Sequence, residues 1–370
     1  PEALSRAVSV LRVLGLLDDD GLPTNTGREV SAVPASPRLG LMLVLARRWG
    51  CSMYGAAVVA ALSVGDPCMY GRQQVAHTSV GEGAEDEKMK DTSEATTKTE
   101  DLEGGEEQED IEEETPLPPM LPAQVAFGDA HSDVLRVVNA LGAYEYERAM
   151  AIKDARADMQ KAANSIAAVD GVAADDKHDE EANESKKTKD ARAKQVEIEE
   201  SAANAVGKAF CDQYNINHKL LKEILSLKAQ LIRDTADGIR AKQLRKRKGE
   251  PEDITQQLLP PPDADQKLKL RKLIVAGFID RVARLKPIGD MPHHPTRGAA
   301  YIPCRQGDGT EIEGGITGVA AGGARLVWLH RGSALHSTRT DDPPEWIVYQ
   351  EVMEGRNRGG DGRAEKRYLK

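Results

Sequence analysis

The sequence PASPRLGLMLVLARRWGC, residues 34–51, predicts a helix that is almost entirely buried. Ser36 can cap its start, and Pro37 suits its first turn. Gly50 offers a left-handed exit after a basic last turn. The apolar side chains recur every three or four positions and leave little of the helix for water: Leu39, Leu41, Met42, Leu43, Val44, Leu45 and Ala46.

A second helix should follow at once and lie close to another helix. The segment SVGDP, Ser63 to Pro67, ends it, because proline cannot continue a helix. Its small side chains let a neighbouring helix approach closely, and they are Ala56, Ala57, Ala60 and Ala61. We therefore expect the chain to be organised around this pair of helices.

The composition of the 370-residue chain favours helical domains. Hydrophobic residues make up 40% of it, which is enough for real cores, whereas the aromatic content of 4% argues against a large β-sandwich. The formal charge of −10 comes mostly from acidic runs at 82–114 and 170–200. Because the remainder is mildly basic, the charge does not exclude a nucleic-acid partner.

Cysteine usage and hydropathy bear on the environment of the protein. Cys51, Cys68, Cys211 and Cys304 are widely spaced and form no C-x-x-C pair, which predicts reduced thiols of an intracellular protein. No apolar run reaches the roughly 18 to 20 residues that span a bilayer, so we expect no membrane partner. The sequence begins in the middle of a pattern and without Met, so we expect it to be a piece of a longer protein.

The helix pair resembles the helicase-associated region of DEAH-box RNA helicases. In that family a Pro-x-x-Pro-Arg-Leu turn, a Gly-Cys pair and an Ala-x-Leu-Ser-Val-x-Asp-Pro end occur in the order found here between Pro34 and Pro67. The stretch SDVLRVVNALGAYEYE looks closest to the helicases of small ribosomal subunit assembly. Similar wording recurs at residues 14–30, 132–147, 210–231, 270–285 and 343–352. The resemblance implies a winged helix, a helical bundle and an OB-type barrel.

The expected fold class is mainly α with a C-terminal β-barrel, interrupted by disordered acidic insertions. Residues 71–122 carry too little apolar surface to offset chain entropy. Residues 155–202 could form a lone solvated helix, but the run DDKHDEEANESKK favours disorder. The expected parts are a winged helix (1–33), the first part of the bundle (34–70), an acidic insertion (71–122), the second part (123–154), a charged insertion (155–202), the third part (203–239), a basic and Pro-rich linker (240–265), and a helix with an OB-type barrel (266–370).

Periodicity places several elements within these parts. Residues 1–33 should form a helix, an acidic turn at 18–21 and a second helix from Thr26. Ser132 should cap a helix whose inward residues are Val134, Val137, Val138, Leu141 and Tyr144. A further helix should carry Leu220, Ile224, Leu227 and Leu231 on one stripe, and another should run from Gln266 to Lys286. Strands are expected at 300–303, 325–330 and 345–352.

Clustered Lys and Arg side chains are what phosphate binding needs, so basic clusters are the candidate RNA-binding residues. The densest basic block, Arg240 to Lys248, could also be a solvated linker or a nuclear-localisation signal. Arg38 could instead form a cap or an ion pair, and His330 could meet a local partner in a strand. The candidates are Arg38, Arg240, Lys242, Arg245, Lys246, Arg247, Lys248, Lys267, Lys269, Arg271, Lys272 and His330.

The sequence lacks the residues that a motor would need. It contains no phosphate-cradling Gly-x-x-x-x-Gly-Lys-Ser/Thr loop and no acidic box for Mg²⁺, so we expect no catalytic residue and no ATP hydrolysis by this chain alone. His293 and His294 with Cys304 lack the spacing of a zinc site, so we expect no metal. The resemblance implies that ATP and Mg²⁺ bind to motor domains upstream.

The resemblance implies the accessory region of an ATP-dependent, 3′-to-5′ RNA-unwinding enzyme. Its partners would be single-stranded pre-rRNA or small nucleolar RNA, the motor domains and an activating protein at the barrel, in the nucleolus of the nucleus. A spliceosomal helicase, a non-catalytic RNA- or protein-binding module and an acidic assembly chaperone remain alternatives. A DNA-binding winged helix is disfavoured, because no basic recognition helix is present.

Overall fold

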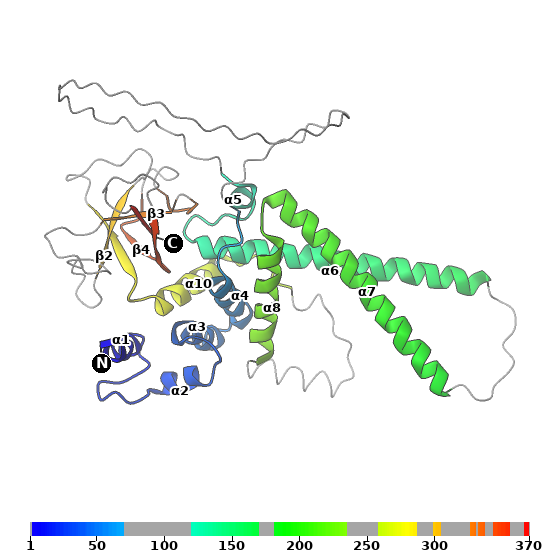
Figure 1. Cartoon of the computed structure of the whole chain (residues 1–370), viewed down its shortest axis with the longest axis horizontal. Helices are drawn as coiled ribbons and strands as arrows, with labels where there is room; N and C mark the ends of the chain where they lie inside the picture. The colour runs from blue at the N-terminus through cyan, green and yellow to red at the C-terminus, as the bar shows by residue number, and fades with distance from the viewer. Residues whose placement is uncertain are drawn as a thin grey trace, which may run out of the picture.

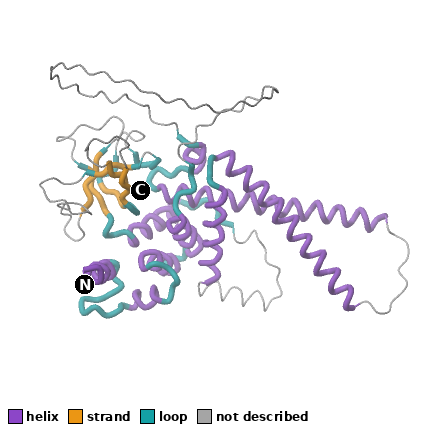
Figure 2. Tube along the Cα trace, in the orientation of Figure 1, coloured by secondary structure: helices purple, strands orange, loops and turns teal. Residues whose placement is uncertain are grey.

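The computed structural model describes residues 2–69, 120–169, 181–234, 258–286, 299–304, 326–330, 332–336, 343–355 and 366–369. Within them, a body of helices lies beside one sheet, and two long helices extend away from the body (Figures 1 and 2). The helices are α1 (Glu2–Val13), α2 (Asn25–Ser31), α3 (Pro37–Arg48), α4 (Ser52–Val64), α5 (Pro122–Phe127), α6 (Asp133–Val169), α7 (Glu181–Tyr214), α8 (His218–Asp234) and α10 (Ala264–Gly277). The strands are β1 (Val282–Leu285), β2 (Ala300–Cys304), β3 (Val327–Leu329), β4 (Trp346–Val348), β5 (Val352–Gly355) and β6 (Lys366–Leu369).

The predicted helix pair is confirmed as α3 and α4. Gly50 links them with a φ of 70°, which is the left-handed exit expected of a glycine. The two helices approach so closely that a Cβ on Gly55 would lie 2.2 Å from the Cβ of Ala46. Ser36 occupies the N-cap position, but its side chain makes no capping hydrogen bond, so that part of the prediction is wrong. Its carbonyl oxygen accepts from the Gly40 N–H instead, at 2.8 Å.

The N-terminal segment leaves a large apolar side chain exposed. Leu4 on α1 is 71% exposed. A single β-bridge joins Leu17 to Pro23 across the acidic turn. The hydroxyl of Thr24 caps α2 by accepting from the Gly27 N–H at 3.0 Å, so this helix begins one residue before the expected Thr26. These described residues do not confirm a winged helix.

The helical core forms around α4, which packs against α3, α6 and α8. Ser132 caps α6 as predicted, because its Oγ accepts from the Leu135 N–H at 3.3 Å. Tyr144 is fully buried on α6 and lies edge-on to Phe210 of α7. On α8 the inward stripe includes Ile224 and Leu231, as predicted. All four cysteines are buried, and none of them forms a disulfide with a described residue.

The charged run at 155–202 is the largest correction to the sequence analysis. The disorder favoured there is wrong for its described residues, because α6 continues to Val169 and α7 begins at Glu181 (Figure 1). The guanidinium of Arg156 donates two hydrogen bonds of 2.8 Å to the carboxylate of Glu199, which joins the two helices. Ala, Lys and Glu are strong helix formers, so local propensity and this contact stabilise helices despite the charge. Residues 70–119 and 170–180 lie outside the described residues.

The predicted helix from Gln266 to Lys286 is partly wrong. It ends at Gly277, and the residues from Val282 to Leu285 form β1 instead. At Gly277 the helix lies against α3, where a Cβ would be 2.1 Å from the Cε of Met42. The chain then turns, and β1 pairs with β2 on one side and β4 on the other. Pairing on both sides overrides the helical pattern of this segment.

The sheet has six strands in the order β4-β1-β2-β3-β6-β5, and all neighbours are antiparallel except β3 and β6. The strands expected at 300–303 and 325–330 correspond to β2 and β3. The single strand expected at 345–352 is two strands, β4 and β5, because the chain leaves β1 after Tyr349. A further strand, β6, lies at the C-terminal end. The sheet buries Ala283, Tyr301, Val327, Leu329 and Ile347, but the described strands do not confirm an OB-type barrel.

Lys228 and Glu145 form a buried ion pair in the helical core. The ammonium of Lys228 donates to the Glu145 carboxylate at 2.7 Å, and both side chains are almost fully buried. Burial raises the pKa of Glu145 and lowers that of Lys228, in each case against the opposite pull of the partner. The contact spans α6 and α8, so its stability matters to the whole helical body.

We predict that Lys228→Met destabilises the chain by about 3–5 kcal/mol, because it leaves a buried carboxylate without its cation. The double variant Lys228→Met/Glu145→Met should lose less than the single one. Because burial raises the pKa of Glu145, the folded chain binds a proton there more tightly than the unfolded chain does. The loss of stability in Lys228→Met should therefore grow as pH rises from about 5 to about 8 and Glu145 loses that proton. Urea unfolding followed by circular dichroism measures both effects, and a double variant less stable than Lys228→Met would contradict the argument.

Candidate functional site at the junction of helices and sheet

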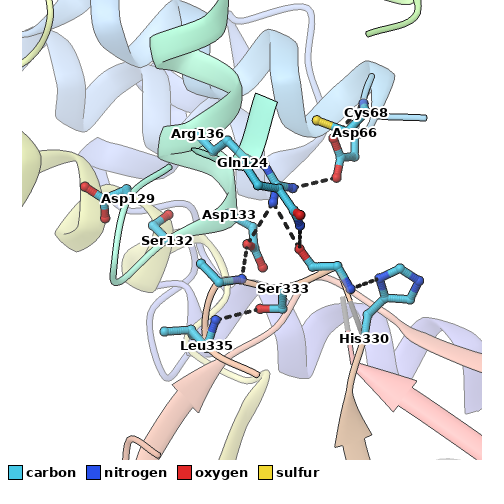
Figure 3. A network of polar contacts seen from close by, with 12 residues as sticks. Asp66, Cys68, Gln124, Asp129, Ser132, Asp133, Arg136, His330, Ser333 and Leu335 are labelled. Atoms are coloured by element: carbon cyan, nitrogen blue, oxygen red, sulfur yellow. Dashed lines mark hydrogen bonds and ion pairs between the residues drawn. The ribbon is translucent and has the colours of Figure 1, made fainter. Parts of the chain in front are cut away.

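The turn that follows β3 meets the start of α6 and the end of α4 (Figure 3). Asp133, the first residue of α6, accepts from the Ala334 N–H at 2.8 Å. Farther along, the side-chain amide of Gln350 donates to the Leu62 carbonyl oxygen of α4 at 3.0 Å. These contacts join segments about 200 or more residues apart in sequence, so the junction fixes the sheet against the helical body.

Arg136 lies at the centre of the junction and is 2% exposed (Figure 3). Its Nη1 donates to the Gly332 carbonyl oxygen at 3.0 Å, and its Nη2 donates to Oδ2 of Asp66 at 2.8 Å. Oδ1 of Asp133 lies 3.5 Å from Nη1. One buried cation therefore holds the end of α4, the first turn of α6 and the turn after β3.

Gln124 of α5 completes the arrangement around Gly332. Its Nε2 donates to the Gly332 carbonyl oxygen at 2.7 Å, so this oxygen accepts from two side chains. Its Oε1 accepts from the Leu121 N–H at 2.8 Å, which fixes the orientation of the amide. Burying an amide that keeps its hydrogen bonds costs little stability, whereas burying one without them would destabilise the fold by about 1–3 kcal/mol.

His330 stabilises the turn after β3 through two local hydrogen bonds. Its Nδ1 accepts from the Gly332 N–H at 3.1 Å, and its carbonyl oxygen accepts from the Ser333 N–H at 2.8 Å. The hydroxyl of Ser333 accepts from the Leu335 N–H at 3.2 Å. An Nδ1 that accepts a hydrogen bond is unprotonated, so the neutral ring carries its proton on Nε2. His330 thus meets a local partner, as one reading of the sequence anticipated.

A cavity of about 260 Å³ opens beside these residues. Its wall is mainly apolar, and the lining includes Leu62, Cys68, Val137, His330 and Gln350. Burial, with Asp66 beside it, raises the pKa of the Cys68 thiol to about 12, so the thiol stays protonated at neutral pH. The site can hold a group through shape and hydrogen bonds, but Cys68 is no nucleophile there.

The other basic residues predicted to bind RNA are separated and differ in their availability. The guanidinium of Arg38 donates to both carboxylate oxygens of Asp280 and to the Gly277 carbonyl oxygen, so the ion-pair reading describes this residue. Burial pushes the pKa of Asp280 upward, but the hydrogen bond and charge of Arg38 lower it overall. On α10, Lys267 lies 3.3 Å from Oδ2 of Asp129, and Lys269 lies 2.7 Å from Oδ2 of Asp265.

The remaining α10 candidates behave differently. Lys272 is exposed and has no ion pair with any described residue. Arg271 is half-buried, and its Nε has no hydrogen-bond partner among the described residues. Residues 240–248 lie outside the described residues. Of the predicted positions that lie in described residues, the structure brings only His330 into the junction.

The sequence analysis missed Arg136, Gln124 and Asp66. One signal was available, because Arg136 is the only charged residue in the run Val134 to Val138, and a charge within an apolar run suggests a buried partner. The described residues contain no group of three or more His, Cys, Asp or Glu side chains that could hold a metal ion. None of their helices combines the length and apolarity that crossing a bilayer requires.

Comparison with known proteins finds a family match for one part of the chain. Residues 36–109 match the family model of the helicase-associated domain (HA2), ratchet-like, which covers α3 and α4. The chain is 45% identical over 65 residues to the probable ATP-dependent RNA helicase DHR1 of Saccharomyces cerevisiae, a match covering 18% of this chain and 5% of that protein. It is 41% identical over 83 residues to the DExH-box ATP-dependent RNA helicase DExH3 of Arabidopsis thaliana, covering 21% and 7%.

A longer match reaches the probable ATP-dependent RNA helicase kurz of Drosophila melanogaster, with 26% identity over 148 residues, 40% of this chain and 10% of that protein. The matches thus span about a tenth or less of the length of these relatives. The names of these relatives agree with the family that the sequence resembles. The chain therefore carries a helicase-associated domain of the kind found in the C-terminal region of DEAH-box RNA helicases.

Proposed function

We propose that this chain is the accessory region of an ATP-dependent RNA helicase and that it holds single-stranded RNA while upstream motor domains, with ATP and Mg²⁺, move along the strand. The observation that carries the proposal is the helicase-associated match on α3 and α4, which are the centre of the helical core. Three similar proteins bear the name of ATP-dependent RNA helicase. In this proposal residues 1–33 belong to a winged helix, and the six-stranded sheet belongs to an OB-type barrel.

The proposed place of action is rRNA processing and small ribosomal subunit assembly, in the nucleolus. What supports it is the likeness of residues 132–147 to the helicases of that subfamily, together with the match to DHR1. The RNA would then be pre-rRNA or a small nucleolar RNA, and an activating protein would bind at the sheet.

The junction supplies a physical means of coupling. Arg136 and Gln350 connect the sheet to α4 and α6 through buried or half-buried hydrogen bonds. Because charge-assisted hydrogen bonds are shorter and stronger than neutral ones, the two parts should move as one body. RNA held on one part would therefore experience displacements of the other, which is what a motor-associated channel requires.

Among the described basic residues, those without carboxylate partners are the better phosphate contacts. Lys269 would have to leave Asp265, whereas Lys272 is already free of ion pairs with the described residues. The basic block at 240–248 adds six cations that the sequence alone identifies. Both sets act by releasing counterions from RNA, so they should dominate the salt dependence of binding.

We predict that the intact chain binds oligo(U) and that affinity falls steeply with salt. Replacing the six cations of the 240–248 block by Gln should flatten the slope of log affinity against log salt by about 0.7 for each lost phosphate contact. Lys272→Gln should flatten it by about one contact, and Lys269→Gln by less. Fluorescence anisotropy over a salt series measures the slopes.

The matched control for these variants is Lys161→Gln, because Lys161 is exposed on α6 and pairs only with Asp158. It should leave the slope unchanged. If the wild-type chain bound no RNA at any salt concentration, the proposed RNA-holding role of this region would be wrong. Equal slopes for the block variant and the wild type would instead exclude the basic block as the contact.

Arg136 tests the coupling. We predict that Arg136→Met loses about 3–5 kcal/mol of unfolding free energy, because the half-buried Asp66 carboxylate loses its cation and the Gly332 carbonyl oxygen loses a donor. The sheet should also unfold before the helices, so that the fluorescence of the sheet residues Trp328 and Trp346, measured with Trp49 replaced by Phe, no longer changes together with the helical circular dichroism. Arg48→Ala, which breaks an exposed pair with Glu29, should cost less than about 1 kcal/mol. Coincident transitions in Arg136→Met would contradict the coupling role.

A further inference from the structure

An aromatic ring lies uncovered at one edge of the sheet. β4 is the edge strand next to β1, and its first residue, Trp346, is 47% exposed. A tryptophan side chain buries a large apolar area when it packs, so an exposed tryptophan keeps a large apolar surface that a ligand can cover. The position is far along the chain from the helicase-associated match at 36–109.

Arg284 lies directly across from this ring. It is the register partner of Trp346, and its guanidinium carbon is 5.4 Å from the ring centroid. Its Nε and Nη2 donate to Oε1 of Glu345 at 3.2 and 3.1 Å, which holds the planar group in place over the ring. Its Nη1 has no hydrogen-bond partner among the described residues and is available to an anionic ligand.

The described neighbours of the ring on this sheet face are covered. The side chain next along the row, Ile302 of β2, is 5% exposed, and Val348 of β4 packs against the helical core. The exposed surface is therefore one ring with a cation beside it rather than a broad apolar patch. A stable protein interface would need a wider apolar area, whereas a single flat group with a phosphate needs only these two side chains.

We propose that Trp346 and Arg284 form a stacking site for one base of single-stranded RNA at the β4 edge. The ring offers the face opposite Arg284 to the base, and Arg284 offers its Nη1 to the adjoining phosphate. Stacking of this kind tolerates every base, because each has a π face. The inference rests on the proposed RNA-holding function and adds to it one contact that is not ionic, the stacking of a base on Trp346.

The test uses the intact chain and labelled oligo(U) of about 12 nucleotides, a length that one such site and its neighbours can hold. Trp346→Ala should weaken binding about tenfold with an unchanged salt slope, because no cation is lost. Trp346→Phe should keep most of the affinity, since a smaller ring still stacks. Arg284→Ala should weaken binding and also flatten the slope by about 0.7.

Two controls separate stacking from folding and from general RNA affinity. Tyr146→Ala removes an aromatic ring of similar exposure, 52%, on α6 and should leave binding unchanged. An abasic ribose-phosphate oligomer should bind the wild type and Trp346→Ala equally, because it offers no base to stack. Circular dichroism melting of each variant shows whether the fold is kept, and Trp346→Phe tests the contact even if the alanine variant is less stable.

The outcomes distinguish this inference from the function on which it rests. If oligo(U) binds and Trp346→Ala binds it as tightly as the wild type does, the stacking site is wrong while the RNA-holding function stands. An equal loss on the abasic oligomer would overturn stacking in the same way and would assign the effect to folding. If the wild type binds neither oligomer, both the function and the stacking site are wrong.

Discussion

The structure depends most on one buried cation, the guanidinium of Arg136. It binds the side chain of Asp66 and the backbone oxygen of Gly332, two groups separated by 266 positions in the chain. A buried Arg without such partners would cost several kcal/mol, so its burial is possible only where α4, α6 and the turn after β3 meet as they do. The burial of this charge therefore requires the sheet to lie where it does, and moving the sheet would leave Arg136 buried without its partners.

Close backbone contact sets the geometry on the opposite side of the core. Gly55 lets α4 touch Ala46 of α3, and Gly277 lets α10 touch Met42 of the same helix. Any larger side chain would force these helices apart. Because α10 leads straight into β1, its depth against α3 decides where the sheet begins. Arg38 then fixes this corner by binding Asp280, three residues past the end of α10.

The spacing of apolar residues correctly predicted the helices that are buried on one face or on all sides. The wide apolar stripe of α3 and the alanines of α4 indicated helices, and the structure places them as expected. Patterns failed where tertiary contact decided the outcome. The segment VARL fits a helix by spacing and becomes β1 because strands lie on both sides of it. Composition failed at 155–202, because charge alone does not reveal a partner such as Glu199 for Arg156.

The candidate site was harder to predict from sequence than the fold, and charge pairing explains why. A sequence shows which residues are cationic, but not which of them already bind a carboxylate. Arg38, Lys267 and Lys269 each have such a partner, and binding a phosphate would require them to give it up. Counting basic residues thus overstates the surface available to RNA. In the proposed RNA-holding role, affinity at this surface would depend more on contacts that salt does not screen, and the exposed ring of Trp346 beside Arg284 offers such a contact.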